Sequence, residues 1–255
     1  MLGAVIGDVI GSHYERNGVK SKYFGLFPKE AHFTDDTVLS IAVAKSILDG
    51  ESYLSNIVKF GRAYPDVGYG SSFWRWVEGD EHKPYNSWGN GSAMRVSAIG
   101  WAFDDEATLL QEAKKSAEVT HNHIEGIKGA KATALAIWMA RQGQSKEAIK
   151  EAIEREFDYD LSRTLDAIRP EYKFDVSCAG SVPESIICFL ESDSFEDCIR
   201  NAISLGGDAD TMAAIAGGIA EAYYQEIPQF IIDEVYTILP NEFIEILERF
   251  NDLYR

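Results

Sequence analysis

Apolar residues recur every three to four positions along almost the whole chain, and this pattern limits the fold more than any other feature of the sequence. The spacing predicts helices over residues 35–49, 52–62, 106–119, 126–142, 145–156, 182–191, 195–204, 210–224 and 242–254. Ser52 and Ser145 stand where helix N-caps belong, and Gly50 and Gly143 stand where helices should end. Because alternating strand patterns are scarce, the sequence predicts an all-α fold.

The sequence contains nothing that divides it into separate units. Pro accounts for only 7 of the 255 residues, and no low-complexity or repeated segment is present that would act as a linker. A hydrophobic content of 45% is enough to fill a substantial core. We therefore expect one compact domain over residues 1–255, which we take to be a monomer.

Composition also narrows the location and the partners of the chain. No run of about 18 apolar residues is present, and residues 1–15 lack a basic leader, so we expect neither a membrane helix nor a signal peptide. A net charge of −17 counts against nucleic-acid binding, although bound cations can reverse the sign locally for a phosphate-bearing ligand. Three cysteines without a CxxC pair argue against a disulfide framework or a zinc knuckle. We expect a soluble, cytoplasmic protein with no membrane or nucleic-acid partner.

Two short acidic motifs precede apolar helical stretches: TDDT at residues 34–37 and GGDADT at residues 206–211. One Asp in each motif could serve as an N-cap, but a cap needs only one carboxylate. A second buried carboxylate adds repulsion that divalent cations would relieve. If the two helix starts face each other, four carboxylates and two hydroxyls form a set of hard oxygen ligands suited to a pair of Mg²⁺, Mn²⁺ or Ca²⁺ ions. The alternative is two independently capped helices.

The N-terminal stretch GAVIGDVIGSHYE adds a packing signal and two carboxylates. Gly3, Gly7 and Gly11 lie on one helix face and would permit a close crossing by another backbone. Asp8 and Glu15 are seven positions apart, so they lie on roughly the same face. Glu15 could belong to a metal or acid–base site, or it could be an exposed residue at the end of a helix.

Residues 16–33 and 64–91 interrupt the helical pattern, and long irregular segments in a helical domain often carry function. The second segment ends in a Gly-rich turn, SWGNG at residues 87–91, before an apolar helix. Such a turn can present backbone N–H groups to an anion. The sequence THNH at residues 120–123 joins two helices, and its histidines could bind a metal, contact a ligand or form a polar turn.

Taken together, these motifs resemble the ADP-ribosylglycohydrolase family. The matching pieces span residues 3–220 and are, in order, GAVIGDVIGSHYE, FTDDT, YPDVGYG, NSWGNGSAMR, THNH and SLGGDADTMAAIAGGIA. The specific part is the succession of FTDDT, GNGSAMR and GGDADT. The resemblance implies a compact orthogonal bundle of helices with a binuclear metal site at its centre.

The resemblance also implies roles for individual residues. The implied metal ligands are Thr34, Asp35, Asp36, Asp208, Asp210 and Thr211. They would hold two Mg²⁺ ions, with Mn²⁺ as the alternative, and Asp210 would bridge them. Glu15, or one of the metal-bound Asp35 and Asp210, would act in catalysis. The implied ligand-binding residues are Ser87, Trp88, Gly89, Asn90, Gly91, His123 and Tyr69.

The implied function is hydrolysis of the glycosidic bond between ADP-ribose and an acceptor, with release of ADP-ribose. Two other interpretations stand beside it: a non-catalytic ADP-ribose-binding or structural descendant of the family, and a metal-dependent nucleotide phosphohydrolase. Product analysis separates the three, because they yield free ADP-ribose, no product or phosphate. The sequence does not choose between arginine-linked, serine-linked, acetyl-linked and nucleobase-linked substrates.

Overall fold

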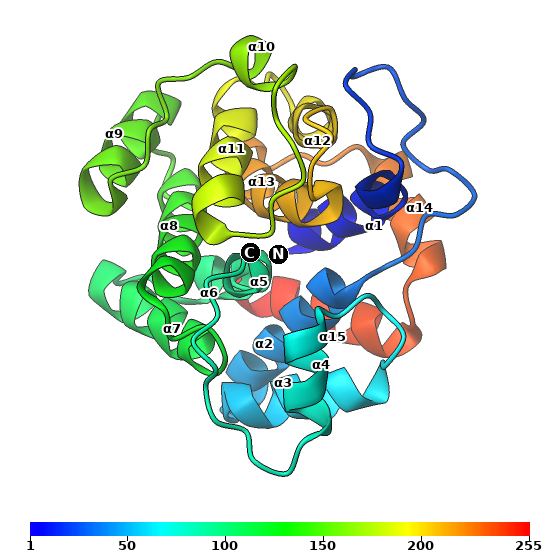
Figure 1. Cartoon of the computed structure of the whole chain (residues 1–255), viewed down its shortest axis with the longest axis vertical. Helices are drawn as coiled ribbons and strands as arrows, with labels where there is room; N and C mark the ends of the chain where they lie inside the picture. Colours follow the sequence, from blue (N-terminus) through cyan, green and yellow to red (C-terminus); the bar gives the residue numbers. More distant parts are fainter.

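The computed structural model describes residues 1–255 as an all-α fold with fifteen helices and no sheet, as predicted (Figure 1). The helices are α1 (Leu2–Arg16), α2 (Asp35–Asp49), α3 (Tyr53–Ala63), α4 (Ser71–Glu78), α5 (Gly91–Met94), α6 (Ser97–Ala102), α7 (Glu106–Glu118), α8 (Ile124–Arg141), α9 (Lys146–Phe157), α10 (Leu165–Ile168), α11 (Cys178–Leu190), α12 (Phe195–Ile203), α13 (Ala209–Tyr224), α14 (Gln229–Ile238) and α15 (Asn241–Tyr254). No helix combines the length and the apolar character that crossing a lipid bilayer would need.

The nine segments predicted from the apolar spacing are all helical, and their ends differ by a few residues at most. The largest difference is at α11, which begins at Cys178 because Ser177 caps it by accepting a hydrogen bond from the backbone N–H of Gly180. The expectation that residues 64–91 are irregular throughout is wrong. Residues 71–78 form α4, a two-turn helix that buries Phe73 and Trp76.

The centre of the fold is the contact between α1 and α13, which lie side by side in the middle of Figure 1. The close crossing predicted from the glycine spacing is confirmed. A Cβ on Gly7 would lie 2.1 Å from the carbonyl oxygen of Ala213, and a Cβ on Gly11 would lie 2.5 Å from the Cα of Asp210. The two backbones therefore touch, and this contact brings Asp8 on α1 beside the first turn of α13.

The remaining helices surround this pair and share one continuous apolar core. Helices α8, α11 and α12 pack on α13, whereas α2 packs on α1 and is covered by α3 and α15. A hydrogen bond between the Thr211 hydroxyl and Asp36 joins the first turns of α13 and α2. The packing therefore places the two acidic motifs of the sequence at one point in the interior.

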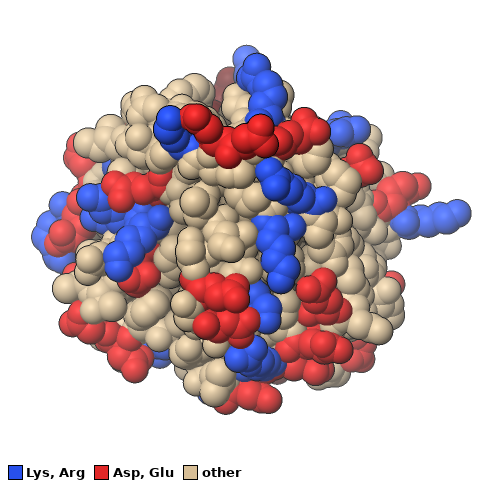
Figure 2. Space-filling view, turned by 90° about the horizontal axis from the view of Figure 1, so that it is seen from below, with Lys and Arg blue, Asp and Glu red and all other residues tan.

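The Asp and Glu side chains do not form a single negative patch on the face shown in Figure 2. On this face, Lys and Arg side chains are interspersed with Asp and Glu side chains. Opposite charges this close together screen one another, so the field of this face is weaker than the net charge of −17 alone would indicate.

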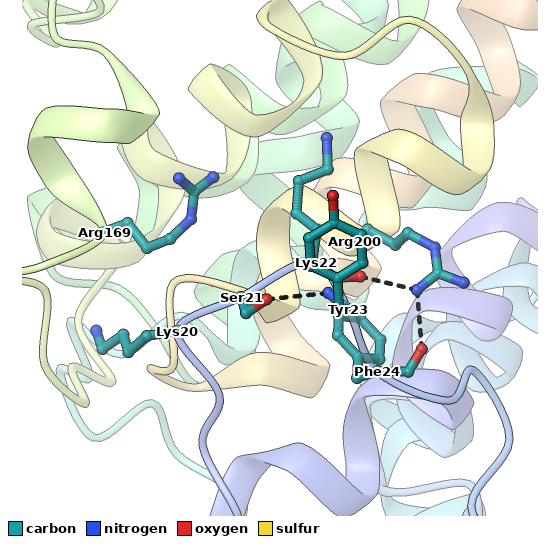
Figure 3. A pocket seen from close by; sticks show the side chains of 7 residues that line it. All are labelled: Lys20, Ser21, Lys22, Tyr23, Phe24, Arg169 and Arg200. Atoms are coloured by element: carbon teal, nitrogen blue, oxygen red, sulfur yellow. Dashed lines mark hydrogen bonds between the residues drawn. The ribbon is translucent and has the colours of Figure 1, made fainter.

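Basic side chains hold the loop between α1 and α2, residues 17–34, against neighbouring helices (Figure 3). They surround a hollow of about 730 Å³ lined by Lys20, Ser21, Lys22, Tyr23, Phe24, Arg169 and Arg200. Arg200 donates to the carbonyl oxygens of Lys22 and Phe24, at 3.0 and 2.9 Å, and Lys20 donates to two backbone carbonyls outside the loop. Lys22 pairs with Asp197. These cations are therefore already used in holding the loop.

Candidate active site

A cavity of about 950 Å³ opens where the first turns of α2 and α13 meet the C-terminal half of α1. Its size lies at the upper end of the range of small-molecule sites, which is roughly 300–1,000 Å³. Most residues implied by the family resemblance line it: Glu15, Thr34, Asp35, Asp36, Ser87, Trp88, Gly89, Asn90, Gly91, Asp208, Asp210 and Thr211. Segments far apart in the sequence thus meet around one cavity.

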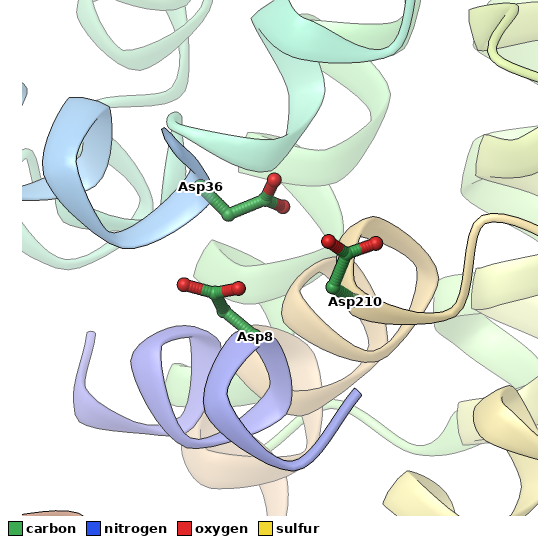
Figure 4. A group of neighbouring side chains, drawn as sticks. All are labelled: Asp8, Asp36 and Asp210. Carbon is green, nitrogen blue, oxygen red and sulfur yellow. The ribbon is translucent and has the colours of Figure 1, made fainter. Parts of the chain in front are cut away.

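Three buried aspartates from three different helices point toward one another (Figure 4): Asp36 and Asp210 line the cavity, and Asp8 lies beside them. Each of Asp8, Asp36 and Asp210 offers a carboxylate oxygen, and these oxygens lie within 4.8 Å of one another. Such a cluster of hard oxygen donors fits a divalent cation of the Mg²⁺ class.

Asp8 accepts most of the hydrogen bonds in the cluster, although it is not among the metal or catalytic residues predicted from the sequence. One carboxylate oxygen accepts from the backbone N–H groups of Thr34 and Thr37, at 2.9 and 3.0 Å, and from the Thr37 hydroxyl. The other accepts from the Thr34 hydroxyl at 2.6 Å. Asp8 therefore ties α1 to the first turn of α2, and most of its lone pairs are already used. The available signal was a carboxylate on an apolar, glycine-lined helix face.

No aspartate side chain of the two motifs makes a capping hydrogen bond, although Asp208 occupies the N-cap position of α13. Helix α2 is capped by the Thr34 hydroxyl, which accepts from the N–H of Asp36 at 3.3 Å, and α13 has no side-chain cap. The alternative of two independently capped helices therefore fails to explain why each motif holds two aspartates. One carboxylate oxygen of Asp36 is buried and has no hydrogen-bond partner, so it is free to coordinate a cation.

The pKa shifts and the charges around the cluster also favour a bound cation. Burial raises the pKa of Asp36 well above its usual value, and the charges of Asp8 and Asp35 add to this effect. Burial, helped by the charge of Asp8, raises the pKa of Asp35 to about 8. No Lys or Arg forms an ion pair with any of these carboxylates. Positive charge is missing from the cluster, and a bound divalent cation would supply it.

Glu15 stands on the wall of the same cavity, one turn beyond Ser12 and close to Asp208. Its carboxylate is partly exposed. Burial raises the pKa of Glu15, and the charge of Asp208 raises it further. Asp208 itself is held by Asn90, whose side-chain amide donates to it at 2.8 Å. The Gly-rich turn is thereby joined to the second acidic motif.

The turn of residues 87–91 also lines the cavity. The backbone of Gly89 pairs with that of Ser177, and the N–H of Asn90 donates to the carbonyl oxygen of Val176 at 2.8 Å. Trp88 lines the cavity and is 52% exposed, and its carbonyl oxygen accepts from the N–H of Cys178 at 3.0 Å. This part of the cavity lining therefore combines the exposed ring of Trp88 with a turn that is held by hydrogen bonds to the segment before α11.

Two of the implied ligand-binding residues do not line the cavity. His123 is the N-cap of α8, where its imidazole accepts from the N–H of Glu125 at 3.1 Å, and His121 lines the cavity in its place. Tyr69 stacks on Phe73, with the ring centroids 5.0 Å apart, and supports the wall from behind. Burial raises the pKa of Tyr69, and the nearby charge of Asp35 raises it further.

Comparison with known proteins agrees with this arrangement. The family model for ADP-ribosylglycohydrolase matches residues 1–255. ADP-ribosylhydrolase ARH3 of Mus musculus is 28% identical, over 90% of this chain and 84% of the relative. The ADP-ribosyl-[dinitrogen reductase] glycohydrolase of Rhodospirillum rubrum is 26% identical, over 88% and 83%. A solved structure described as an ADP-ribosylglycohydrolase-related protein complex superposes with a TM-score of 0.76 at 26% identity, covering 100% of this chain and 95% of the other.

The fold and the cavity define an all-α protein with a buried acidic site to which both aspartate motifs contribute. The chain belongs to the ADP-ribosylglycohydrolase family.

Proposed function

We propose that this chain hydrolyses the glycosidic bond between ADP-ribose and an acceptor, and that it uses two divalent cations held in the acidic cluster. The observation that carries the proposal is the meeting of both acidic motifs at the floor of a ligand-sized cavity. The unpartnered buried oxygen of Asp36 and the missing positive charge support the use of metal. The names of the relatives support ADP-ribose as the group released.

The proposed ligand set follows the two motifs. Thr34, Asp35 and Asp36 would hold one ion, and Asp208 and Thr211 the other, with Asp210 shared between them. Bound ions of this class polarise substrate oxygens and lower the pKa of bound water. Asp8 would keep the first motif in place through its hydrogen bonds to Thr34 and Thr37.

The other lining residues would hold the substrate. Glu15 would exchange a proton with the water that attacks the anomeric carbon, as glycoside cleavage requires an acid–base group near that atom. In the turn of residues 87–91, the N–H groups of Ser87, Gly89 and Asn90 already donate within the protein, so the turn would offer the diphosphate the N–H groups of Trp88 and Gly91. Trp88 would also offer its exposed ring.

Product analysis tests the proposal directly. The chain is incubated with arginine-linked, serine-linked and acetyl-linked ADP-ribose, and the products are separated by chromatography. Release of free ADP-ribose from one of these supports the proposal and identifies the linkage. Release of phosphate indicates a phosphohydrolase, and ADP-ribose binding without product indicates a binding protein.

Glu15→Gln tests the assignment of the acid–base group. The substitution should lower kcat by about 10²- to 10⁴-fold, the usual contribution of a positioned proton-transfer group. ADP-ribose affinity, measured by calorimetry, should change little. A loss of affinity with an unchanged kcat would make Glu15 a binding residue instead.

A further inference from the structure

Residues 66–70, between α3 and α4, lie against Asp35 at the start of α2. The carbonyl oxygen of Val67 accepts a hydrogen bond from the backbone N–H of Asp35 at 3.0 Å. A Cβ placed on Gly68 would lie 3.5 Å from the Oδ1 atom of Asp35. Val67, Gly68 and Asp35 all line the cavity, so this contact is part of the cavity wall.

Asp35 is held differently from its neighbours in the first acidic motif. Asp8 accepts from the N–H groups and the hydroxyls of Thr34 and Thr37, but it makes no hydrogen bond to Asp35. Asp35 is the first residue of α2, and the first N–H groups of a helix have no partner within the helix. The carbonyl group of Val67 therefore supplies the partner that α2 cannot supply.

The segment of residues 66–70 is itself anchored by the two helices that it joins. On the α4 side, Tyr69 stacks on Phe73 and Trp74, with ring centroids 5.0 and 5.9 Å apart. On the α3 side, Arg62 donates to the carbonyl oxygen of Val77 in α4 at 2.9 Å. Since α3 and α4 are joined to each other in this way, the segment has a defined position from which to hold α2.

Gly68 provides the backbone conformation that this contact needs. Its φ is +101°, in the left-handed region where a residue with a Cβ is strained. The peptide group between Val67 and Gly68 is planar, so φ of Gly68 sets the direction of the Val67 carbonyl relative to the residues that follow. A longer side chain at this position would also stand beside the Oδ1 atom of Asp35.

We propose that Gly68 is a positioning residue for the metal ligand Asp35. Its left-handed conformation directs the Val67 carbonyl to the N–H of Asp35, and its missing side chain leaves the Asp35 carboxylate open to a cation. That Asp35 binds metal rests on the proposed function, whereas the hydrogen bond and its dependence on Gly68 do not. From the sequence, only Tyr69 of this segment was predicted to contact the ligand.

Gly68→Ala and Gly50→Ala form a matched pair for this proposal. Gly50 ends the same helix that Asp35 begins, has a positive φ of +67°, and a Cβ there would meet no atom within 4 Å. Both substitutions therefore strain a left-handed residue next to α2, but only Gly68→Ala acts at the cavity. Circular dichroism gives the Tm of each variant, so a general loss of stability is measured separately.

Binding of Mn²⁺ without substrate tests the effect on the metal site, because electron paramagnetic resonance counts the free ion. Gly68→Ala should weaken Mn²⁺ binding by about 10- to 100-fold, the usual effect of removing a group that orients a metal ligand. Gly50→Ala should bind Mn²⁺ as wild type does. Equal affinities in the two variants would overturn the proposal. If wild type itself binds no Mn²⁺, the proposed metal site fails, and the metal role of Gly68 fails with it.

Amide hydrogen exchange in the metal-free protein tests the hydrogen bond by itself. The Asp35 amide should be protected in wild type and in Gly50→Ala, and it should exchange about tenfold faster in Gly68→Ala, the effect of losing one hydrogen bond. An unprotected Asp35 amide in wild type would overturn the proposal even if Gly68→Ala did not fold. Unchanged protection in a folded Gly68→Ala would overturn it as well.

Discussion

Gly7→Ala tests whether the backbone contact between α1 and α13 builds the site. The added methyl group would lie 2.1 Å from the carbonyl oxygen and 2.3 Å from the carbonyl carbon of Ala213. Because both atoms belong to the backbone, no side chain can move aside, and the helices must separate by about 1 Å to reach a normal contact.

Gly7→Ala should lower the free energy of unfolding, whereas helix propensity alone would raise it. Ala is favoured over Gly inside a helix by about 0.5–1 kcal/mol, whereas overpacking a buried contact costs about 1–3 kcal/mol and sometimes more. We expect a net loss of about 1–3 kcal/mol in the free energy of unfolding, because the clash involves two rigid helices. For a chain of this size, the corresponding fall in Tm is about 3–10 °C.

Thermal unfolding followed by circular dichroism measures this effect, and Gly25→Ala is the matched control. A Cβ on Gly25 meets no atom within 4 Å, so its Tm should stay within about 2 °C of wild type. Gly7→Ala should also weaken metal binding, since Asp8 would move away from Thr34 and Thr37. An unchanged or higher Tm for Gly7→Ala would refute the reasoning.

Two further predictions concern titratable groups. Without metal, the free energy of unfolding should fall as the pH rises from about 4 to about 8, because the raised pKa of Asp35, about 8, means that the folded state binds this proton more tightly than the unfolded state does. In urea unfolding, Asp35→Asn or excess Mg²⁺ should reduce this fall, and an identical pH dependence in Asp35→Asn would contradict the assignment. Burial raises the pKa of the thiols of Cys178 and Cys198 to about 12, so neither should react with a thiol reagent at pH 8 until the chain unfolds. Rapid labelling of the native protein, quantified by mass spectrometry, would show that these thiols are accessible.

The local signals in the sequence were sufficient for most of the fold. Apolar spacing and capping residues act within one or two turns, so the nine predicted helices are found near their expected limits. Helix α4 was missed because it has only two turns and lies in a Gly-rich segment, where Phe73 and Trp76 are its main apolar signal. The glycine spacing of α1 predicted a close crossing, but only the fold identifies α13 as the partner.

The site depends more strongly than the helices do on contacts between segments that are far apart in the sequence. Asp8 was visible as a carboxylate in an apolar helix, yet its function depends on the Thr34 and Thr37 groups that pack against it. Likewise, nothing local distinguishes His121 from His123. Because His123 caps the start of α8, His121 is the histidine that lines the cavity.

The central claim is that cleavage depends on cations held by the two aspartate motifs. The direct measurement is the rate of ADP-ribose release against Mg²⁺ concentration for wild type, Asp36→Asn and the control Asp252→Asn, whose side chain is exposed and outside the cavity. Wild type and Asp252→Asn should respond to Mg²⁺ alike and lose activity in chelator, whereas Asp36→Asn should stay inactive at every concentration while keeping its fold. Full activity in chelator, or in Asp36→Asn, would contradict the account.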